Sequence, residues 1–394
     1  MSGLHTQILA ASRISLKSMA LRIGPSLTTI LTTALVVAVL LSFQTMSNGF
    51  NRAVTEGGSD SVALILSQGA SKEINSSVTR DQASLLNSAP GIAHVGGEPI
   101  LSPEFYVVVN SSGAGDKPQS SLQLRGMNTM GPGLRSGFRL VSGRMFQPGK
   151  GEIMVGKALR ETFPNLRDGK VVSFGHSRWR VVGTFVTASA AYESEMWTDG
   201  DTLRSLFERQ SGLQSVRVKL ISPQAIETLR RYVNSDPRLK LSVYSETDYL
   251  RDSASRTGDV IMYLGWPLAI AMSLGALAGA MNTTYNSVRS RSSEIATLRA
   301  LGFRGVAAFF GVLSESIVLS VVGGILASIL VYLATNGITA STIGNGFTQQ
   351  IFSFSLTPTA VMEGLVLALV VGFLGGVAPA IRAARMPIAA AFHE

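Results

Sequence analysis

The chain has 394 residues, of which 46% are hydrophobic and 15% are charged, and its formal net charge is +9. High hydrophobicity with low charge excludes a disordered protein. The sequence has no cysteine, which excludes a disulfide framework, a thiolate metal site and a cysteine nucleophile, and its four histidines are too scattered to suggest a histidine-rich metal site.

Long segments without Asp, Glu, Lys or Arg interrupt the chain. A helix needs about 20 mostly apolar residues to cross a hydrocarbon core of roughly 30 Å, and each segment is long enough to hold one. Buried core helices are the alternative, but so many of them would require a much larger soluble shell. The sequence therefore predicts transmembrane helices at residues 25–46, 259–286, 307–335 and 359–381.

Residues 1–24 have the pattern of an amphipathic helix, with Arg13 and Lys17 away from the apolar side. That apolar side consists of Leu4, Ile8, Leu9, Leu16 and Met19. We expect this helix to lie in the membrane interface. The first span could also belong to a signal peptide, but residues 42–51 offer no small-x-small cleavage site, which favours an uncleaved anchor.

The distribution of basic residues predicts the orientation, because short loops rich in Lys and Arg stay in the cytoplasm. The loop at 287–306 is strongly basic, the tail at 382–394 contains Arg382 and Arg385, and the loop at 336–358 has no charge. We expect an inner-membrane protein with both termini in the cytoplasm and residues 47–258 in the periplasm. Without a basic patch that includes aromatic residues, no nucleic-acid partner is indicated.

Residues 47–258 have the pattern of an α+β domain. Strands are expected at Val62–Leu66, Phe105–Val109, Leu122–Arg125, Glu152–Val155, Lys170–Phe174, Trp179–Val186 and Val216–Ile221. Helices are expected after the Thr79/Gln82 capping box, at Lys157–Phe163, at Asp199–Gln210 and from Ser222-Pro223. The Gly-rich stretch Arg125–Gly143 is expected to be a mobile surface loop. The predicted fold class is an α-helical membrane protein with one transmembrane helix before this large extracytoplasmic domain and three after it.

No motif for catalysis or nucleotide binding occurs in the sequence. G-x-S-x-G, H-E-x-x-H and G-x-G-x-x-G are absent, and none of the Gly-Lys pairs is followed by Ser or Thr as in a phosphate-binding loop. We therefore expect a non-catalytic chain without a cofactor or metal, whose outer domain binds a partner or transmits force. A membrane-tethered enzyme is the disfavoured alternative.

The segment Asn282–Phe303 leaves the second span and continues into the basic loop. Ser292 and Ser293 are expected to cap a short helix with Glu294 in its first turn, and Gly302 is expected to end it. Its apolar edge consists of Ile295, Leu298 and Leu301. Such a helix is suited to docking into the groove of a partner, although a helix that only lies in the headgroup layer has the same pattern.

This segment resembles the coupling segment of the MacB/FtsX-type (type VII) ABC transporter permeases. The matching residues are Asn282, Ser287, Val288, Arg291, Glu294, Ile295, Leu298, Arg299, Ala300, Leu301 and Gly302. The ending Pro379, Ala383, Ala384, Pro387, Ile388 and Ala390 is similar to the exit of the family's last span, and Leu140–Phe146 and Glu152–Val155 resemble elements of its outer domain. The order of spans around an outer domain is also the family's layout.

The resemblance implies a permease that forms a dimer and binds two copies of an ABC ATPase, which holds the ATP and Mg²⁺. It also implies a set of residues that contact this ATPase: Arg289, Arg291, Ser293, Glu294, Ile295, Leu298, Arg299, Leu301 and Gly302. MacB itself carries its ATPase fused to the permease, so here the ATPase is expected in a separate chain. Movement would then be transmitted across the membrane without the substrate necessarily crossing the bilayer.

Two further features lie inside the predicted spans. Gly275, Gly279, Gly372 and Gly376 permit close approach of helices, either within one chain or between two copies. Glu315 lies inside the third span, where a carboxylate needs a partner. We expect a structural pair with a cation such as Arg22 or Arg289, and a proton-coupled role is the alternative.

The leading functional hypothesis is export with a periplasmic adaptor and an outer-membrane channel. The cargo class implied by the resemblance is broad: a drug, lipid, siderophore, peptide or toxin. The alternatives are an FtsX-like regulator of a cell-wall hydrolase and a lipoprotein extractor of the LolC type. FtsX-like members tend to have a smaller outer domain than residues 47–258, which disfavours the regulator.

Overall fold

The computed structural model describes residues 4–19, 23–111, 120–174, 177–207, 212–343 and 349–386. The chain divides into two compact units. The membrane unit comprises Met1–Asn48, Asp259–Ile338 and Phe354–Glu394. The insertion domain comprises Gly49–Gly258 and Thr339–Ser353.

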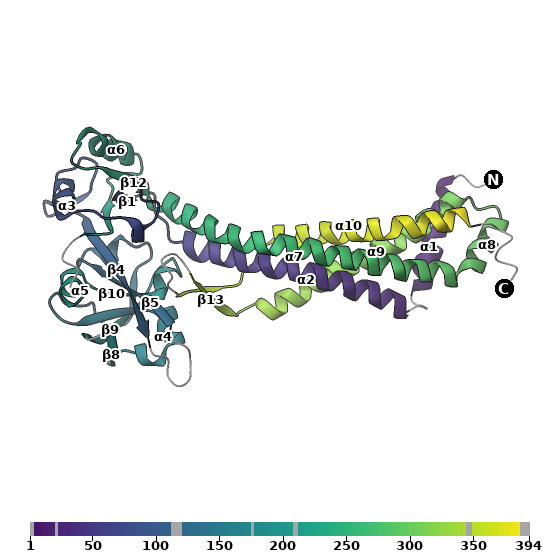
Figure 1. Cartoon of the computed structure of the whole chain (residues 1–394), viewed down its shortest axis with the longest axis horizontal. Helices are drawn as coiled ribbons and strands as arrows, with labels where there is room; N and C mark the ends of the chain where they lie inside the picture. Colours follow the sequence, from purple (N-terminus) through teal and green to yellow (C-terminus); the bar gives the residue numbers. More distant parts are fainter. Residues whose placement is uncertain are drawn as a thin grey trace. The chain divides into compact units, whose positions relative to one another are not determined.

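The membrane unit is built from α1 (Leu4–Ser18), α2 (Ile23–Thr55), α7 (Glu246–Ser290), α8 (Ser292–Ala300), α9 (Gly305–Thr335) and α10 (Pro358–Arg385) (Figure 1). The helices α2, α7, α9 and α10 are long and apolar enough to cross a membrane, so the predicted four spans are confirmed. Two of these helices continue beyond the predicted spans, α2 to Thr55 and α7 from Glu246. The decrease in hydrophobicity along the sequence indicates where a transmembrane span ends, but the helix itself can continue beyond that point.

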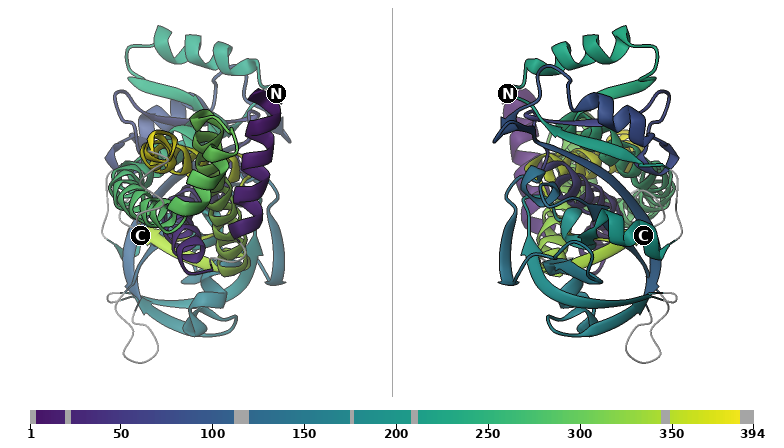
Figure 2. Two further views of the ribbon diagram at one scale, coloured as in Figure 1. Left: turned by 90° about the vertical axis from the view of Figure 1, so that its right-hand side faces the viewer. Right: turned by 90° about the vertical axis from the view of Figure 1, so that its left-hand side faces the viewer.

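Helix α1 packs across α9 and does not run parallel to it (Figure 2). The contact is close at Gly311, where a Cβ atom would lie 3.0 Å from Ser15 Oγ. Ala11 is buried, whereas Leu9 and Ile14 of the same helix are 62% and 47% exposed. The helix therefore buries one side on α9 and leaves apolar side chains exposed on another, and its position in the membrane interface stays a prediction.

Small residues set the distance between α9 and α10. A Cβ atom at Gly372 would lie 2.8 Å from Ser320 Cβ, and one at Gly376 would lie 2.8 Å from Ser316 Cβ. Ser316 Oγ donates a hydrogen bond to the carbonyl of Gly372 (2.8 Å). The glycines of α7 differ, because a Cβ atom at Gly275 or Gly279 meets no atom of the described chain within 4 Å.

The insertion domain contains a mixed sheet with the strand order β12-β1-β11-β4-β5-β10-β7-β9-β6, and β8 pairs with β9. Its strands are β1 (Val62–Ser67), β4 (Leu101–Ser111), β5 (Ser120–Met127), β6 (Arg139–Gly143), β7 (Glu152–Gly156), β8 (Val171–Phe174), β9 (Ser177–Val186), β10 (Glu195–Asp199), β11 (Ser215–Lys219) and β12 (Leu241–Ser245). Short hairpins are formed by β2 (His94–Val95) with β3 (Glu98–Pro99), and by β13 (Thr339–Ile343) with β14 (Gln349–Ser353). Every expected strand is present.

Three sequence predictions for loops need correction. The stretch Arg125–Gly143 is an ordered part of the fold that includes the 3₁₀ turn η3 (Gly131–Leu134) and β6, and it buries Arg125 and Arg135. Strands β10 and β12 were missed because they are short and lie beside helical patterns. The segment at 336–358, expected to be a short periplasmic loop, contains the hairpin β13–β14.

The helices of the insertion domain are α3 (Arg80–Leu86), α4 (Lys157–Thr162), α5 (Gly200–Leu206) and α6 (Ala225–Ser235), together with the 3₁₀ turns η2 (Glu73–Asn75), η4 (Pro164–Leu166) and η5 (Tyr192–Ser194). The Thr79/Gln82 capping box is present at α3. The predicted start of α6 is wrong: Ser222-Pro223 forms a turn, and the helix begins at Ala225 without a side-chain cap. The predicted end of the α5 helix at Gln210 lies outside the described residues.

One face of the sheet carries two large hydrophobic cores, and a smaller cluster of Leu64, Leu66 and Ala70 is separate from them. Helices α3 and α6 cover β1, β11 and β12, whereas α4 and α5 cover β4, β5, β7 and β10. Alternation along the strands places Val216 and Val218 in a core and turns Arg217 between them to the opposite face. Glu104, Arg125 and Glu195 occupy the same alternate positions on their strands. The opposite face of the sheet is therefore polar in its middle although it is buried.

The α9–α10 contact predicts a difference between glycines. Gly372→Ala should lower the stability of the detergent-solubilised protein by about 1–3 kcal/mol, because the added Cβ meets Ser320 in a packed interface. Gly279→Ala should not destabilise a single chain, since its Cβ has open space and alanine favours a helix. Thermal unfolding under identical conditions measures both. Equal losses at the two positions would contradict the packing described.

Candidate functional site

The segment expected to contact an ATPase is a short helix between two long ones. Helix α7 ends at Ser290, Arg291 is the N-cap residue of α8, and Leu301 is its C-cap residue. Gly302 follows with φ +93°, the left-handed conformation that commonly ends a helix. The expected capping by Ser292 or Ser293 is wrong, because the helix starts one residue earlier and its N-cap makes no side-chain hydrogen bond.

The expected apolar edge of α8 is divided between the interior and the surface. Ile295 is buried with Val312 and Leu313 of α9, whereas Leu301 is 74% exposed and Leu298 is half-buried. The exposed residues of the expected contact set are Arg289, Ser293, Glu294, Leu301 and Gly302. Arg299 is directed inward and donates a hydrogen bond to the carbonyl of Met386. Fewer residues of this segment are therefore available to contact a partner than the sequence predicted.

Arg291, expected to face a partner, instead forms a buried ion pair with Glu315 of α9. The two side chains are 4% and 7% exposed. Of the two partners expected for Glu315, Arg289 is exposed and is not the paired residue, and Arg22 lies outside the described residues. Arg291 follows α7 directly, so the pair holds the junction of α7 and α8 against α9.

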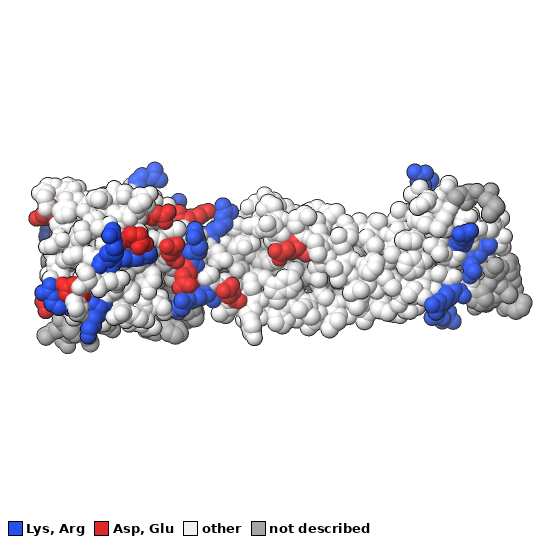
Figure 3. Space-filling view, turned by 90° about the horizontal axis from the view of Figure 1, so that it is seen from above, with Lys and Arg blue, Asp and Glu red and all other residues white. Residues whose placement is uncertain are grey.

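Helix α1 also contacts the end of this segment. The Gln7 side chain donates to the carbonyl of Gly302 (3.4 Å) and accepts from the backbone N–H of Arg304 (3.2 Å). The turn between α8 and α9 is thereby tied to α1. On the face shown in Figure 3, the membrane unit is mostly uncharged and its basic side chains gather at the end that contains α1 and α8.

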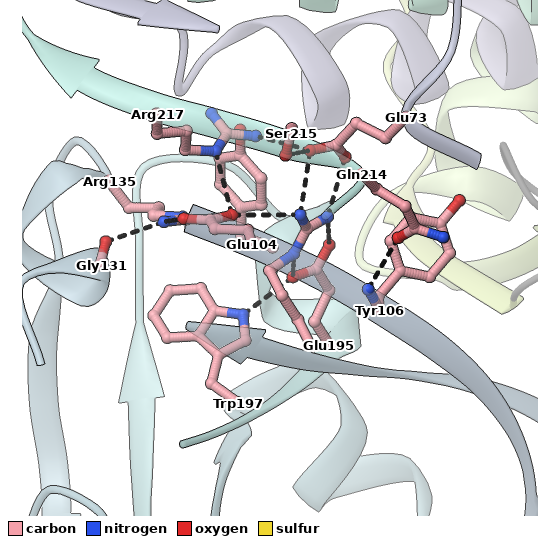
Figure 4. A network of polar contacts seen from close by, with 12 residues as sticks. Glu73, Glu104, Tyr106, Gly131, Arg135, Glu195, Trp197, Gln214, Ser215 and Arg217 are labelled. Carbon is pink, nitrogen blue, oxygen red and sulfur yellow. Dashed lines mark hydrogen bonds and ion pairs between the residues drawn. The ribbon is translucent and has the colours of Figure 1, made fainter. Parts of the chain in front are cut away.

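The polar face of the insertion-domain sheet contains a buried network that the sequence analysis missed (Figure 4). We call it the charge ladder, and its members are Glu73, Glu104, Arg125, Arg135, Glu195, Arg217 and Glu246. None of these side chains is more than 8% exposed. A charge buried to this extent must be paired, and each member has at least one oppositely charged partner in the network.

Arg125 pairs with three carboxylates of the ladder. Its guanidinium lies 3.0 Å from Glu73, 3.2 Å from Glu104 and 2.9 Å from Glu195. Glu104 also pairs with Arg135 at 2.5 Å and with Arg217 at 3.4 Å. The planar guanidinium groups each satisfy several carboxylate oxygens at once, which fixes the geometry of the strands that carry them.

The arginines of the ladder lower the pKa of two of its carboxylates, Glu73 and Glu104. Burial alone raises the pKa of Glu73, but Arg125 and Arg217 outweigh it and lower this pKa to about 2. Burial likewise raises the pKa of Glu104, and the ion pair and hydrogen bonds with Arg135 bring it below its ordinary value. The carboxylates are thus neutralised by arginines, and within the described ranges no group of three or more His, Asp or Glu is placed to hold a metal ion.

A cavity of about 60 Å³ adjoins the ladder. It is lined by ladder members, by Tyr106, Tyr192 and Tyr249, and by Phe50, Val54, Leu250 and Ser253 from the ends of α2 and α7. This volume is that of about two water molecules and is far below the roughly 300–1,000 Å³ of a pocket for a drug-sized ligand. The cavity beside the ladder is therefore too small for a drug-sized ligand.

Comparison with known proteins identifies two regions of the chain. Residues 26–235 match the family model described as MacB-like periplasmic core domain, and residues 267–388 match the model described as FtsX-like permease C-terminal. Over 134 residues the chain is 34% identical to the pyoverdine export ATP-binding/permease protein PvdT of Pseudomonas syringae pv. tomato and 37% identical to that of Pseudomonas fluorescens. Each alignment covers 34% of this chain and only 19% of the relative.

Two solved structures are also similar. One is the periplasmic region of MacB from Actinobacillus actinomycetemcomitans, with 16% identity and a TM-score of 0.38 over 51% of this chain and 94% of that chain. The other is the extracellular domain of the noncanonic ABC-type transporter YknZ from Gram-positive bacteria, with 16% identity and a TM-score of 0.36 over 46% of this chain and 99% of that chain.

The Arg291–Glu315 pair predicts a characteristic pattern of stability. Glu315→Gln leaves Arg291 buried without a countercharge and should lower stability by about 3–5 kcal/mol. The double variant Arg291→Met/Glu315→Leu removes both charges and should recover most of that loss. Asp252→Asn breaks an exposed pair with Arg256 and should cost less than about 1 kcal/mol. Thermal unfolding in detergent compares them, and a double variant less stable than Glu315→Gln would refute the pairing.

The ladder predicts acid sensitivity with a defined sign. Since the pKa of Glu73 falls from 4.5 to about 2 on folding, its contribution is complete above pH 4.5 and is lost as the pH falls toward 2. The shift corresponds to about 3 kcal/mol. Glu73→Gln should flatten the dependence of stability on pH in this range, whereas Glu161→Gln at an exposed site should not. Unfolding of the full chain, followed by tryptophan fluorescence between pH 2 and 6, would contradict this if both variants kept the wild-type slope.

Proposed function

We propose that this chain, which belongs to the MacB/FtsX-type family of ABC transporter permeases, is the permease subunit of an ATP-driven exporter. The family model for the outer domain and that for the permease C-terminal region together cover most of the chain. The observation that carries the proposal is α8, a short helix between α7 and α9 that is attached to α9 through Arg291 and has exposed side chains at Ser293 and Leu301. Such a helix is suited to receive a movement from a partner.

The partner at α8 is, in this proposal, an ABC ATPase on a separate chain, present in two copies. The sequence contains no phosphate-binding loop, so ATP and Mg²⁺ would be held by that subunit. The contact would use Leu301 with Arg289, Ser293, Glu294 and Gly302, whereas Arg291, Ile295 and Arg299 would position the helix from within. The basic loops support a cytoplasmic location for α8 and for both termini, in a bacterial inner membrane.

The proposed mechanism is transmission of movement. Helix α7 is unbroken from Glu246 in the insertion domain to Ser290 beside α8, so a displacement at α8 acts on one end of a helix whose other end begins in the insertion domain. The open face around Gly275 and Gly279 of the same helix has room for close packing with a second copy of the chain. We therefore propose a homodimer with this face at its seam.

Export is the proposed direction of transport, with a periplasmic adaptor and an outer-membrane channel as further partners. The family assignment of the insertion domain supports this choice, and so do the names of the two relatives, which describe export of pyoverdine. Among its described residues, the insertion domain has the small cavity beside the ladder and two larger, more open hollows of about 320 and 600 Å³.

The proposal predicts that Leu301→Asp weakens association with the ATPase at least tenfold, because it puts a charge on the exposed apolar contact without disturbing the core of the unit. Co-purification from native membranes, followed by titration of the purified subunits, measures the loss. Leu206→Asp, at a 44% exposed leucine of the insertion domain, is the matched control and should bind normally. An ATPase that binds wild type and Leu301→Asp equally would refute the proposed contact.

A further inference from the structure

The charge ladder alternates in sign across neighbouring elements of the sheet. Glu246 follows β12, Arg217 is on β11, Glu104 is on β4, Arg125 is on β5 and Glu195 is on β10. Since β11, β4, β5 and β10 are consecutive neighbours in the sheet, each of these four strands contributes one charge to a line of ion pairs. Glu246 extends this line to the first residue of α7.

Glu246 is bound from two directions. Its Oε1 accepts hydrogen bonds from Arg217 Nη1 (2.5 Å) and from the hydroxyl of Tyr192 (2.8 Å). The next turn of α7 is bound as well, because the hydroxyl of Tyr249 accepts from the backbone N–H of Glu73 (3.2 Å). The first turns of α7 are thus attached to the sheet through the ladder itself.

The end of α2 is attached to the same place. Ser189 Oγ and the backbone N–H of Ala191 donate to the carbonyl of Ala53 (2.8 and 3.2 Å). The turn η5, which supplies Tyr192 to Glu246, therefore also holds the last residues of α2. Beyond α2, a Cβ atom at Gly58 would lie only 2.9 Å from Thr247 Cα, so the chain leaving α2 packs directly on the start of α7.

The ladder is poorly explained as a device for stability alone. Replacing buried ion pairs by well-packed apolar residues is often neutral or stabilising for the fold. Moving one partner away, by contrast, leaves the other charge buried without a countercharge, which is strongly destabilising. Glu246 Oε2 is buried and has no hydrogen-bond partner among the described residues, so this carboxylate already carries an uncompensated cost. What such an arrangement gives is a fixed position: α7 cannot shift or rotate on the sheet without separating Glu246 from Arg217 and Tyr192.

We propose that Glu246 and Arg217 are positioning residues that join the start of α7 to the sheet, so that a displacement of α7 is passed to β11 and to its neighbour β1. The inference rests on the proposed function, since it supplies the last step by which a movement of α8 would reach the outer domain. Tyr192 supports the joint from η5. The remaining ladder members connect β11 through β4 and β5 to β10 by ion pairs.

The test is amide hydrogen exchange in the complex of the full chain with its co-purified ATPase, with and without ATP. In wild type, ATP should change exchange both in α8 and in strands β1 and β11. In Glu246→Gln, the α8 response should persist while the response of β1 and β11 falls at least fivefold, and the first turns of α7 should exchange at least tenfold faster. Glu227→Gln, which alters a largely exposed pair with Arg230 on α6, is the matched control and should behave as wild type.

A milder variant keeps the test decisive if Glu246→Gln does not fold. Tyr192→Phe removes only the hydroxyl that binds Glu246, and Tyr232→Phe removes one that donates to the carbonyl of Leu85 on the other face of the sheet. The first should weaken the response of β1 and β11, and the second should not. A wild-type complex without any response in α8 would refute the proposed function, whereas an α8 response with an unchanged sheet response in Glu246→Gln and Tyr192→Phe would overturn the joint.

Discussion

A charged side chain in a low-dielectric interior must keep its partner, and α7 has such a pair beside each of its ends. Arg217 and Glu246 meet at its first residue, and Arg291 and Glu315 meet just after its last. Separating either pair would cost several kcal/mol, more than most single contacts of the fold. These two pairs therefore oppose sliding of the first turn of α7 against the sheet and of its last turn against α9, which is what the proposed transmission of movement requires.

The apolar parts of the chain have a different role. The contact of α9 with α10 depends on small residues such as Gly372 and Gly376, which bring the helices close enough for Ser316 to donate a hydrogen bond across the interface. In the insertion domain, the cores on one face of the sheet supply the burial that stabilises the domain. The ion pairs on the opposite face fix the relative positions of the strands and of the start of α7, whereas the apolar cores provide most of the stability.

The sequence predicted what is written in local patterns. The spans follow from charge-free segments, the capping box at Thr79 from adjacent residues, and the family from α8 and its flanks. Contacts between residues far apart in the sequence could not be predicted from local patterns. Nothing in the sequence around Glu315 shows that it pairs with Arg291 and not with Arg289, because the two arginines differ only in the side of the chain to which they point. The only sign of the ladder in the sequence is a single charge within a predicted strand, such as Arg217 between two valines. The alternation of side chains along a strand predicts that this arginine faces water. The Gly-rich composition around Gly131 led to the prediction of a mobile loop. Composition alone does not reveal that Arg135 in this stretch is buried.

The measurement that tests the central claim most directly is a distance between spin labels on the insertion domain and the membrane unit. The chain has no natural cysteine, so labels can be placed without background at two exposed positions, Ile221 and Leu333. In the complex with the ATPase in lipid, the account predicts that ATP shifts the distance distribution between them and that a Leu301→Asp variant abolishes the shift. An unchanged distribution in a complex that hydrolyses ATP would contradict the transmission of movement along α7.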